Sequence, residues 1–270
     1  MELLFARIAV LVVGSLLGGV QDAKTGLISD KITYAMIGLG IIFNLVELNW
    51  IGLAMGTIVF GIGYLAYYFG KIGGGDVKLF TGIAFLLPFF SGKIFILGVL
   101  FVSAILAVIF YAAYYSLKYA KKGIVLKENY SGIKKAFLFA VVFIAYFALL
   151  LNTKMVPLHT IVFLGIGFAF GLVFLALEKG IRKNFFLKKI KLKELEEDEV
   201  IALDFLDEKT KKALDLQAKG ILGEKEKQKL EKKGITEILV YRNMPPFGPF
   251  IFIAIIAVLL KPDLVGLLFI

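Results

Sequence analysis

Residues 71–80 read KIGGGDVKLF and separate two apolar stretches of the chain, 51–69 and 77–90. Three consecutive glycines and a carboxylate between two lysines are poor material for a surface that faces lipid. The quoted stretch therefore predicts a break between two membrane helices, with Asp76 where the second helix begins. An ionisable residue at such a break in a membrane protein is a candidate functional residue.

The composition of the whole chain also indicates a membrane protein. Of 270 residues, 59% are hydrophobic, and soluble domains are nearer one half. The apolar stretches are 3–20, 32–48, 51–69, 77–90, 94–117, 136–151, 156–177 and 247–268. We predict an all-α polytopic membrane protein, a helical bundle of about six to eight transmembrane helices. A helix rises ~1.5 Å per residue, so the stretch 77–90 reaches only ~21 Å and is expected to be recessed within the bundle.

The segment 178–243 differs from the rest of the chain, because it carries 17 Lys or Arg and 14 Asp or Glu residues. It is predicted to be a small cytoplasmic α/β insert, with a helix over 224–233 and a strand over 235–241. The chain is thus expected to divide into a transmembrane bundle with the candidate aspartates (1–177), the insert, and a C-terminal transmembrane segment (244–270).

The basic residues predict the orientation in the membrane. If the N-terminus lies outside, ten Lys residues of the links fall on the cytoplasmic side and four Lys or Arg residues on the other, as the positive-inside rule requires. The cytoplasmic set is Lys24, Lys31, Lys71, Lys78, Lys118, Lys121, Lys122, Lys127, Lys134 and Lys135. Retention of these residues, together with anionic membrane lipid, also explains the net charge of +10 without a nucleic-acid partner.

The chain contains no cysteine and a single histidine. Disulfides, thiolate metal sites, thiol nucleophiles and two-histidine metal sites are therefore excluded. No cofactor and no metal is expected.

Two carboxylates are predicted to lie at the same cytoplasmic boundary. Asp22 follows the first apolar stretch, and Asp76 precedes the fourth. Two carboxylates ~3–5 Å apart share one proton, so one can act as a base on water while the other polarises a carbonyl group. Taken alone, each aspartate is better explained by simple helix termination, and the glycines before Asp76 by a turn. Asp30, next to Ser29, is assigned to helix N-capping.

The neighbours of Asp76 suggest how a substrate is held. Gly73, Gly74 and Gly75 are expected to allow unusual backbone angles and close approach of an extended peptide. Lys78 is expected to lie near the Asp76 carboxylate or a lipid phosphate. Helix dipoles predict that Asp76, at a helix start, is the more ionised of the two aspartates and that Asp22 is the more protonated.

The pair Gln21-Asp22, followed by Gly26 and Ile28, and the motif GGGDVK at 73–78 resemble the type IV prepilin peptidase family, in its archaeal preflagellin and prepilin peptidase branch. The resemblance is most specific over residues ~1–90. These enzymes are GxGD aspartyl proteases.

The resemblance implies that Asp22 and Asp76 are catalytic, and that Gly73, Gly74, Gly75 and Lys78 shape the substrate loop. It also implies that the substrate is a prepilin or preflagellin (archaellin) precursor with a short basic leader. The hairpin formed by 136–151 and 156–177 departs from the minimal archaeal pattern of six helices.

Two other functions compete with this interpretation. The same aspartates can serve as proton or cation ligands in a coupled transporter, since acids within membranes also mark transport routes. A non-catalytic scaffold acting through the insert would not depend on the aspartates at all.

Overall fold

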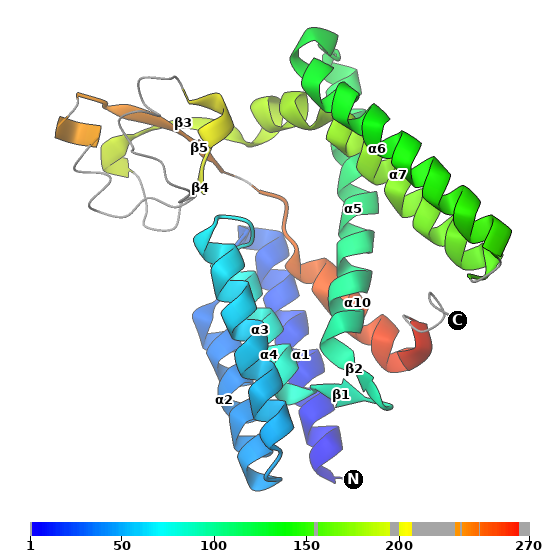
Figure 1. The fold of residues 1–270 in the computed structure, drawn as a ribbon. Coiled ribbons are helices and arrows are strands. Elements are labelled where there is room, and N and C mark those ends of the chain that lie inside the picture. The colour runs from blue at the N-terminus through cyan, green and yellow to red at the C-terminus, as the bar shows by residue number, and fades with distance from the viewer. Residues whose placement is uncertain are drawn as a thin grey trace.

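The computed structural model describes residues 2–153, 156–194, 200–206, 230–232, 234–242 and 244–264. Its main helices are α1 (Glu2–Thr25), α2 (Asp30–Val46), α3 (Trp50–Tyr68), α4 (Gly74–Leu86), α5 (Phe95–Lys122), α6 (Leu126–Thr153), α7 (Leu158–Ile181) and α10 (Gly248–Leu260) (Figure 1). Among the described residues, five helices are long and apolar enough to cross a membrane. The chain is an all-α polytopic membrane protein, as the sequence predicts.

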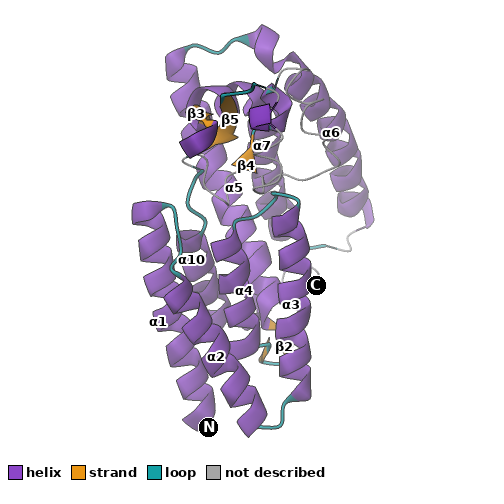
Figure 2. Cartoon of the chain, turned by 90° about the vertical axis from the view of Figure 1, so that its left-hand side faces the viewer, coloured by secondary structure: helices purple, strands orange, loops and turns teal. Residues whose placement is uncertain are grey.

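Helix α4 is the short, recessed helix that the sequence predicts. It has 13 residues, and Leu79, Ile83 and Leu86 on it are fully buried. Helices α2 and α3 lie on either side of it (Figure 2). Both approach closely because Gly40 and Gly56 face it at positions where a Cβ atom would overlap Phe85. We call the end of the bundle where α1 ends and α4 begins the aspartate end.

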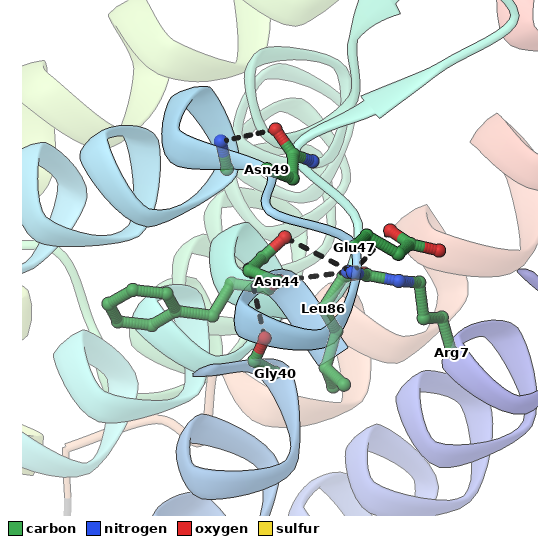
Figure 3. A network of polar contacts seen from close by, with 8 residues as sticks. Arg7, Gly40, Asn44, Glu47, Asn49 and Leu86 are labelled. Atoms are coloured by element: carbon green, nitrogen blue, oxygen red, sulfur yellow. Dashed lines mark hydrogen bonds and ion pairs between the residues drawn. The ribbon is translucent and has the colours of Figure 1, made fainter. Parts of the chain in front are cut away.

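A buried arginine holds the other end of α4. Arg7 on α1 is 4% exposed, and its Nη1 donates a hydrogen bond of 2.8 Å to the backbone oxygen of Leu86 (Figure 3). Its Nη2 donates to Glu47 Oε2 at 2.8 Å and to Asn44 Oδ1 at 3.2 Å. The Asn44 amide donates in turn to the Phe85 oxygen at 2.7 Å.

This network satisfies carbonyl groups that the end of a helix leaves without partners. In a low-dielectric interior such groups are costly unless another group bonds to them. Because Arg7 lies on α1, the network also fixes the lengthwise position of α1 relative to α4. The relative position of Asp22 and Asp76, at the aspartate end of the same two helices, depends on it.

Helix α6 begins ten residues before the apolar stretch that predicted it. The early start is explained by Asn129, which is fully buried. Its Nδ2 donates to Tyr119 Oη on α5 at 3.0 Å, and its Oδ1 accepts from the Gly180 N–H on α7 at 2.9 Å. One amide side chain thus joins the α6–α7 hairpin to α5.

The insert contains a three-stranded sheet in the order β3-β5-β4, from Leu187–Lys191, Glu237–Tyr241 and Val200–Ile201. Strand β5 confirms most of the strand predicted over 235–241 and is antiparallel to both neighbours. Most of the helix expected over 224–233 lies outside the described residues. Because Leu187 pairs with Tyr241, the chain leaves the bundle and returns to it at neighbouring points.

Two further elements complete the described chain. A hairpin of β1 (Phe89–Phe90) and β2 (Lys93–Ile94) joins α4 to α5. Its turn residues, Ser91 and Gly92, both have positive φ, as a tight two-residue hairpin requires. The last apolar stretch, 247–268, is interrupted, because α10 ends at Leu260 and a 3-10 turn follows over Pro262–Leu264.

Candidate active site

Asp22 lies in the last turn of α1 and is only 5% exposed. Its Oδ2 accepts a hydrogen bond of 2.7 Å from the backbone N–H of Gly248, the first residue of α10. The N–H groups of a first helical turn have no partner within the helix, and the helix dipole is positive there. The start of α10 therefore stabilises the anionic form of Asp22.

Two glycines make this contact possible. A Cβ atom on Gly19 would lie 3.0 Å from the Gly248 oxygen, and a Cβ atom on Gly248 would lie 3.1 Å from the Gly19 Cα. Any larger residue at either position must separate α1 from α10 or shift one of their backbones. The close approach of the two helices brings the Gly248 amide to the Asp22 carboxylate.

Tyr111 holds the segment that leads into α10. Its hydroxyl group donates a hydrogen bond of 2.5 Å to the backbone oxygen of Pro246, two residues before Gly248. Tyr111 could not be identified from the sequence, since a tyrosine within an apolar stretch is indistinguishable from a lipid-facing or core residue. The Pro245-Pro246 pair, whose nitrogens carry no hydrogen, was the available signal for an irregular segment with free carbonyl groups.

Asp76 lies in the first turn of α4, three residues after the N-cap residue Gly73. Its Oδ2 folds back toward the cap, 3.1 Å from the place that a Cβ atom on Gly73 would occupy. Asp76 thus lies near the start of its own helix, α4, whereas Asp22 lies near the start of α10. A negative charge is favoured at both places. In contrast to Asp22, Asp76 is half-buried rather than buried.

One cavity of about 580 Å³ is lined by both aspartates. It opens at the aspartate end, between the link after α1 and the start of α4, and Met244 lies at its edge. The fold therefore brings Asp22 and Asp76 to one cavity, although 54 positions separate them in the sequence.

The glycines before Asp76 do not have the unusual backbone angles that the sequence analysis expected. Gly73 has φ −71° and caps α4, and Gly74 and Gly75 are ordinary helical residues. Glycine is needed at positions 74 and 75 because side chains of other segments lie close to their Cα atoms. A Cβ atom on Gly75 would lie 3.1 Å from the Ile28 Cβ, and one on Gly74 would lie 3.3 Å from the Tyr67 ring.

Lys78 and Asp30 also differ from their predicted roles. The Lys78 ammonium group forms an ion pair of 2.6 Å with Asp30 and lies over the Tyr34 ring. Asp30 does not cap α2, because the Ser29 hydroxyl group takes that role by accepting the Lys31 N–H. Both charged residues line the cavity of the aspartates. Within the described part of the chain, no cluster of three or more His, Cys, Asp or Glu side chains could hold a metal ion.

The fold and the site together define a class of protein. It is a polytopic helical membrane protein in which two carboxylates line one cavity at an end of the bundle. Residues 9–112, a range that includes Asp22 and Asp76, match the model of the type IV leader peptidase family. This is the same family that the motifs at residues 21–28 and 73–78 resemble, so the match agrees with the resemblance drawn from the sequence.

One curated relative is the prepilin peptidase EppA of Methanothermobacter thermautotrophicus (strain Delta H), 38% identical over 77 residues. The alignment covers 26% of this chain and 20% of that protein, so the chain spans about a fifth of its relative's length. No solved structure matches the chain.

Proposed function

We propose that the protein is a membrane aspartyl endopeptidase. It removes short basic leader peptides from prepilin or preflagellin-like precursors at the cytoplasmic membrane boundary. The observation that carries the proposal is the cavity that Asp22 and Asp76 share at one end of the bundle. The family match over 9–112 and the similarity to a prepilin peptidase support a peptidase of this kind.

The chemistry needs one ionised and one protonated carboxyl group. The ionised carboxylate takes a proton from water while the water oxygen attacks the carbonyl carbon of the scissile peptide. The protonated carboxyl group gives its proton to the carbonyl oxygen. The tetrahedral intermediate then collapses: the C–N bond breaks, the leaving nitrogen takes the proton that the first carboxyl group gained from water, and the second carboxylate regains a proton from a hydroxyl group of the intermediate. Each carboxyl group thus acts once as an acid and once as a base in a turnover.

The structure favours Asp22 as the ionised member of the resting pair. The hydrogen bond from the Gly248 N–H stabilises its anion, and this contact was invisible in the sequence. This assignment reverses the expectation drawn from the dipoles of α1 and α4 alone.

The proposed orientation suits this reaction. Ten basic residues on the aspartate side of the membrane against four on the other side favour a cytoplasmic aspartate end. The basic leader of the precursor then meets the aspartates without crossing the membrane, while the apolar helix that follows the leader stays in lipid.

The test is cleavage of a leader-bearing precursor by the purified full-length protein in liposomes. Asp22→Asn and Asp76→Asn should each reduce cleavage to less than about a tenth of the wild-type rate, since either change removes a proton carrier. Thermal unfolding should change little, because an asparagine oxygen at position 22 can still accept the Gly248 N–H. Asp30→Asn, in the same cavity, is the matched comparison and should retain more activity than either.

Two outcomes would contradict the proposal. Normal cleavage by either aspartate variant would exclude the pair as the catalytic groups. Ion flux into the liposomes that depends on both aspartates, without cleavage of any precursor, would support a transporter instead.

A further inference from the structure

The cavity of the two aspartates continues along the bundle between α2 and α3. Its lining includes Ile37, seven residues into α2, and Phe60, eight residues before the end of α3. At ~1.5 Å per residue these positions lie roughly 10–12 Å from the helix ends at the aspartate end. The cavity is therefore a groove that reaches from the boundary into the depth of the membrane.

The groove is open to the side. The tyrosines Tyr34 on α2 and Tyr64 on α3 both line it, and each remains more than half exposed. Phe60, also in the lining, is 45% exposed. Helix α4 lies between α2 and α3, and Gly63 on α3 packs directly against its Val77. In a bilayer the exposed aromatic side chains face acyl chains, so an apolar segment can enter the groove laterally.

Charge is distributed unevenly along the groove. Three carboxylates and one ammonium group lie at its mouth, whereas the deeper lining is aromatic or aliphatic. The complementary ligand has cationic residues at the mouth and an uncharged apolar helix beyond them. A lipid of the bilayer lacks this arrangement, because its anionic or zwitterionic headgroup would meet the carboxylates.

We propose that the α2–α3 groove is the docking surface for the apolar helix of the precursor, with the basic leader and the scissile bond at the mouth. The inference rests on the proposed function. It specifies which of several lipid-facing surfaces binds substrate and from which side the substrate enters.

The chain offers a second groove as an internal comparison. A cavity of about 470 Å³ between α5, α6 and α7 is lined by apolar residues, among them Phe143, Phe168 and Leu172. No aspartate lines it, so an apolar helix docked there would have no charged groups to orient it.

Photo-crosslinking distinguishes the surfaces. Benzoylphenylalanine is placed at Tyr64, at Phe143, or at Tyr146 on the lipid-facing side of α6, in full-length Asp76→Asn protein in liposomes with the precursor. Tyr64 and Tyr146 are matched, with exposed fractions of 52% and 51%. The crosslink from position 64 should be on the order of tenfold stronger than from the other two positions.

A kinetic test needs no modified residue. Phe60→Ala should raise KM about three- to tenfold with little change in kcat, as expected for the loss of an aromatic docking contact. Phe137→Ala on α6, also an exposed phenylalanine, should leave both constants unchanged.

The outcomes separate the two proposals. Cleavage by the wild-type protein together with equal crosslinking at positions 64 and 146, or preferential crosslinking at position 143, overturns the groove and leaves the peptidase intact. An unchanged KM in Phe60→Ala also counts against the groove. Absence of precursor cleavage by the wild-type protein overturns the proposed function and this inference with it.

Discussion

Asp22 Oδ2 accepts a 2.7 Å hydrogen bond from the backbone N–H of Gly248, a residue 226 positions later in the chain. The contact joins α1 to α10 and gives a buried carboxylate a partner that no neighbouring segment supplies. Gly19 lies on the other side of the same contact, so the two helices meet backbone to backbone.

This relationship predicts that alanine at position 248 impairs cleavage. The new Cβ atom would lie 3.1 Å from the Asp22 Oδ2 and from the Gly19 Cα, and backbone atoms there cannot rotate away. Gly248→Ala should therefore lower kcat by about tenfold or more, with a fall in the unfolding free energy of about 1–3 kcal/mol from overpacking. Single-turnover cleavage and thermal unfolding in detergent measure the two effects.

The matched control is Gly38→Ala. Gly38 is also a helical glycine, but no atom lies within 4 Å of its Cβ position. This variant should cleave normally and be up to about 1 kcal/mol more stable, since alanine is the better helix former. Equal behaviour of the two variants would mean that the contact between α1 and α10 has no role in catalysis.

The network at the opposite end predicts that Arg7→Ala reduces both stability and cleavage. The change leaves the Leu86 carbonyl group and the Asn44 side chain short of a donor, at a cost of about 2 kcal/mol. It also frees α1 to shift along α4. Arg7→Lys should recover part of both losses, whereas Lys24→Ala, a loss of an exposed charge on the same helix, should cause neither. Full cleavage by Arg7→Ala would show that the register of α1 and α4 does not depend on the network.

The start of α4 predicts a steric rather than a conformational effect at position 75. Gly75→Val brings branched carbon atoms against Ile28, so kcat/KM should fall about tenfold or more. A Cβ atom at Gly61 on α3 would have no neighbouring atom within 4 Å, so Gly61→Val is the control. Lys78→Ala should lower kcat/KM less than Gly75→Val, because the ammonium group pairs with Asp30 rather than with Asp76. The reverse order would mean that Lys78 acts on the reaction directly.

The hydrogen bonds that join α6 to α5 and α7 predict a variant that is less stable but still cleaves normally. Asn129→Leu removes the hydrogen bonds to Tyr119 Oη and from the Gly180 N–H, and the unfolding free energy should fall by about 1–3 kcal/mol. The rate of cleavage per folded molecule should stay near that of the wild type, since none of these groups lines the cavity of the aspartates. Asn152→Ala, an exposed position on α6, serves as the comparison for stability. Loss of cleavage in folded Asn129→Leu protein would place the hairpin in the catalytic unit.

Much of the architecture could be predicted from hydrophobicity alone. Each of the eight apolar stretches overlaps a described helix, and the 14-residue stretch gave the short, buried α4. The predicted helix bounds were least accurate where a polar side chain of one helix forms hydrogen bonds with other helices. Asn129 lies in a charged sequence that resembles a link, and only its contacts with α5 and α7 explain why the helix begins before it.

Some residues of the candidate site could likewise be predicted from the sequence, and others could not. Asp22 and Asp76 were identified because a carboxylate at a break between membrane helices is a candidate functional residue, and because both lie in motifs that resemble the prepilin peptidase family. Tyr111 and the Gly248 amide could not be identified, because their importance lies in contacts between segments more than a hundred positions apart. The capping role assigned to Asp30 was wrong, since a local pattern does not show which of two adjacent polar residues faces the helix end. Lys78 was expected near Asp76, but it pairs with Asp30.

The position of Gly248 in the chain has a consequence for biosynthesis. The ribosome makes α1 and α4 early, but the amide that binds Asp22 is added only after the whole insert has been translated. At about 5–20 residues per second, the 172 residues between Asp76 and Gly248 take roughly 10–30 s. During that interval the nascent chain carries both carboxylates without the helix that packs against one of them, so the proposed peptidase activity should appear only after Gly248 has been added and α10 has formed.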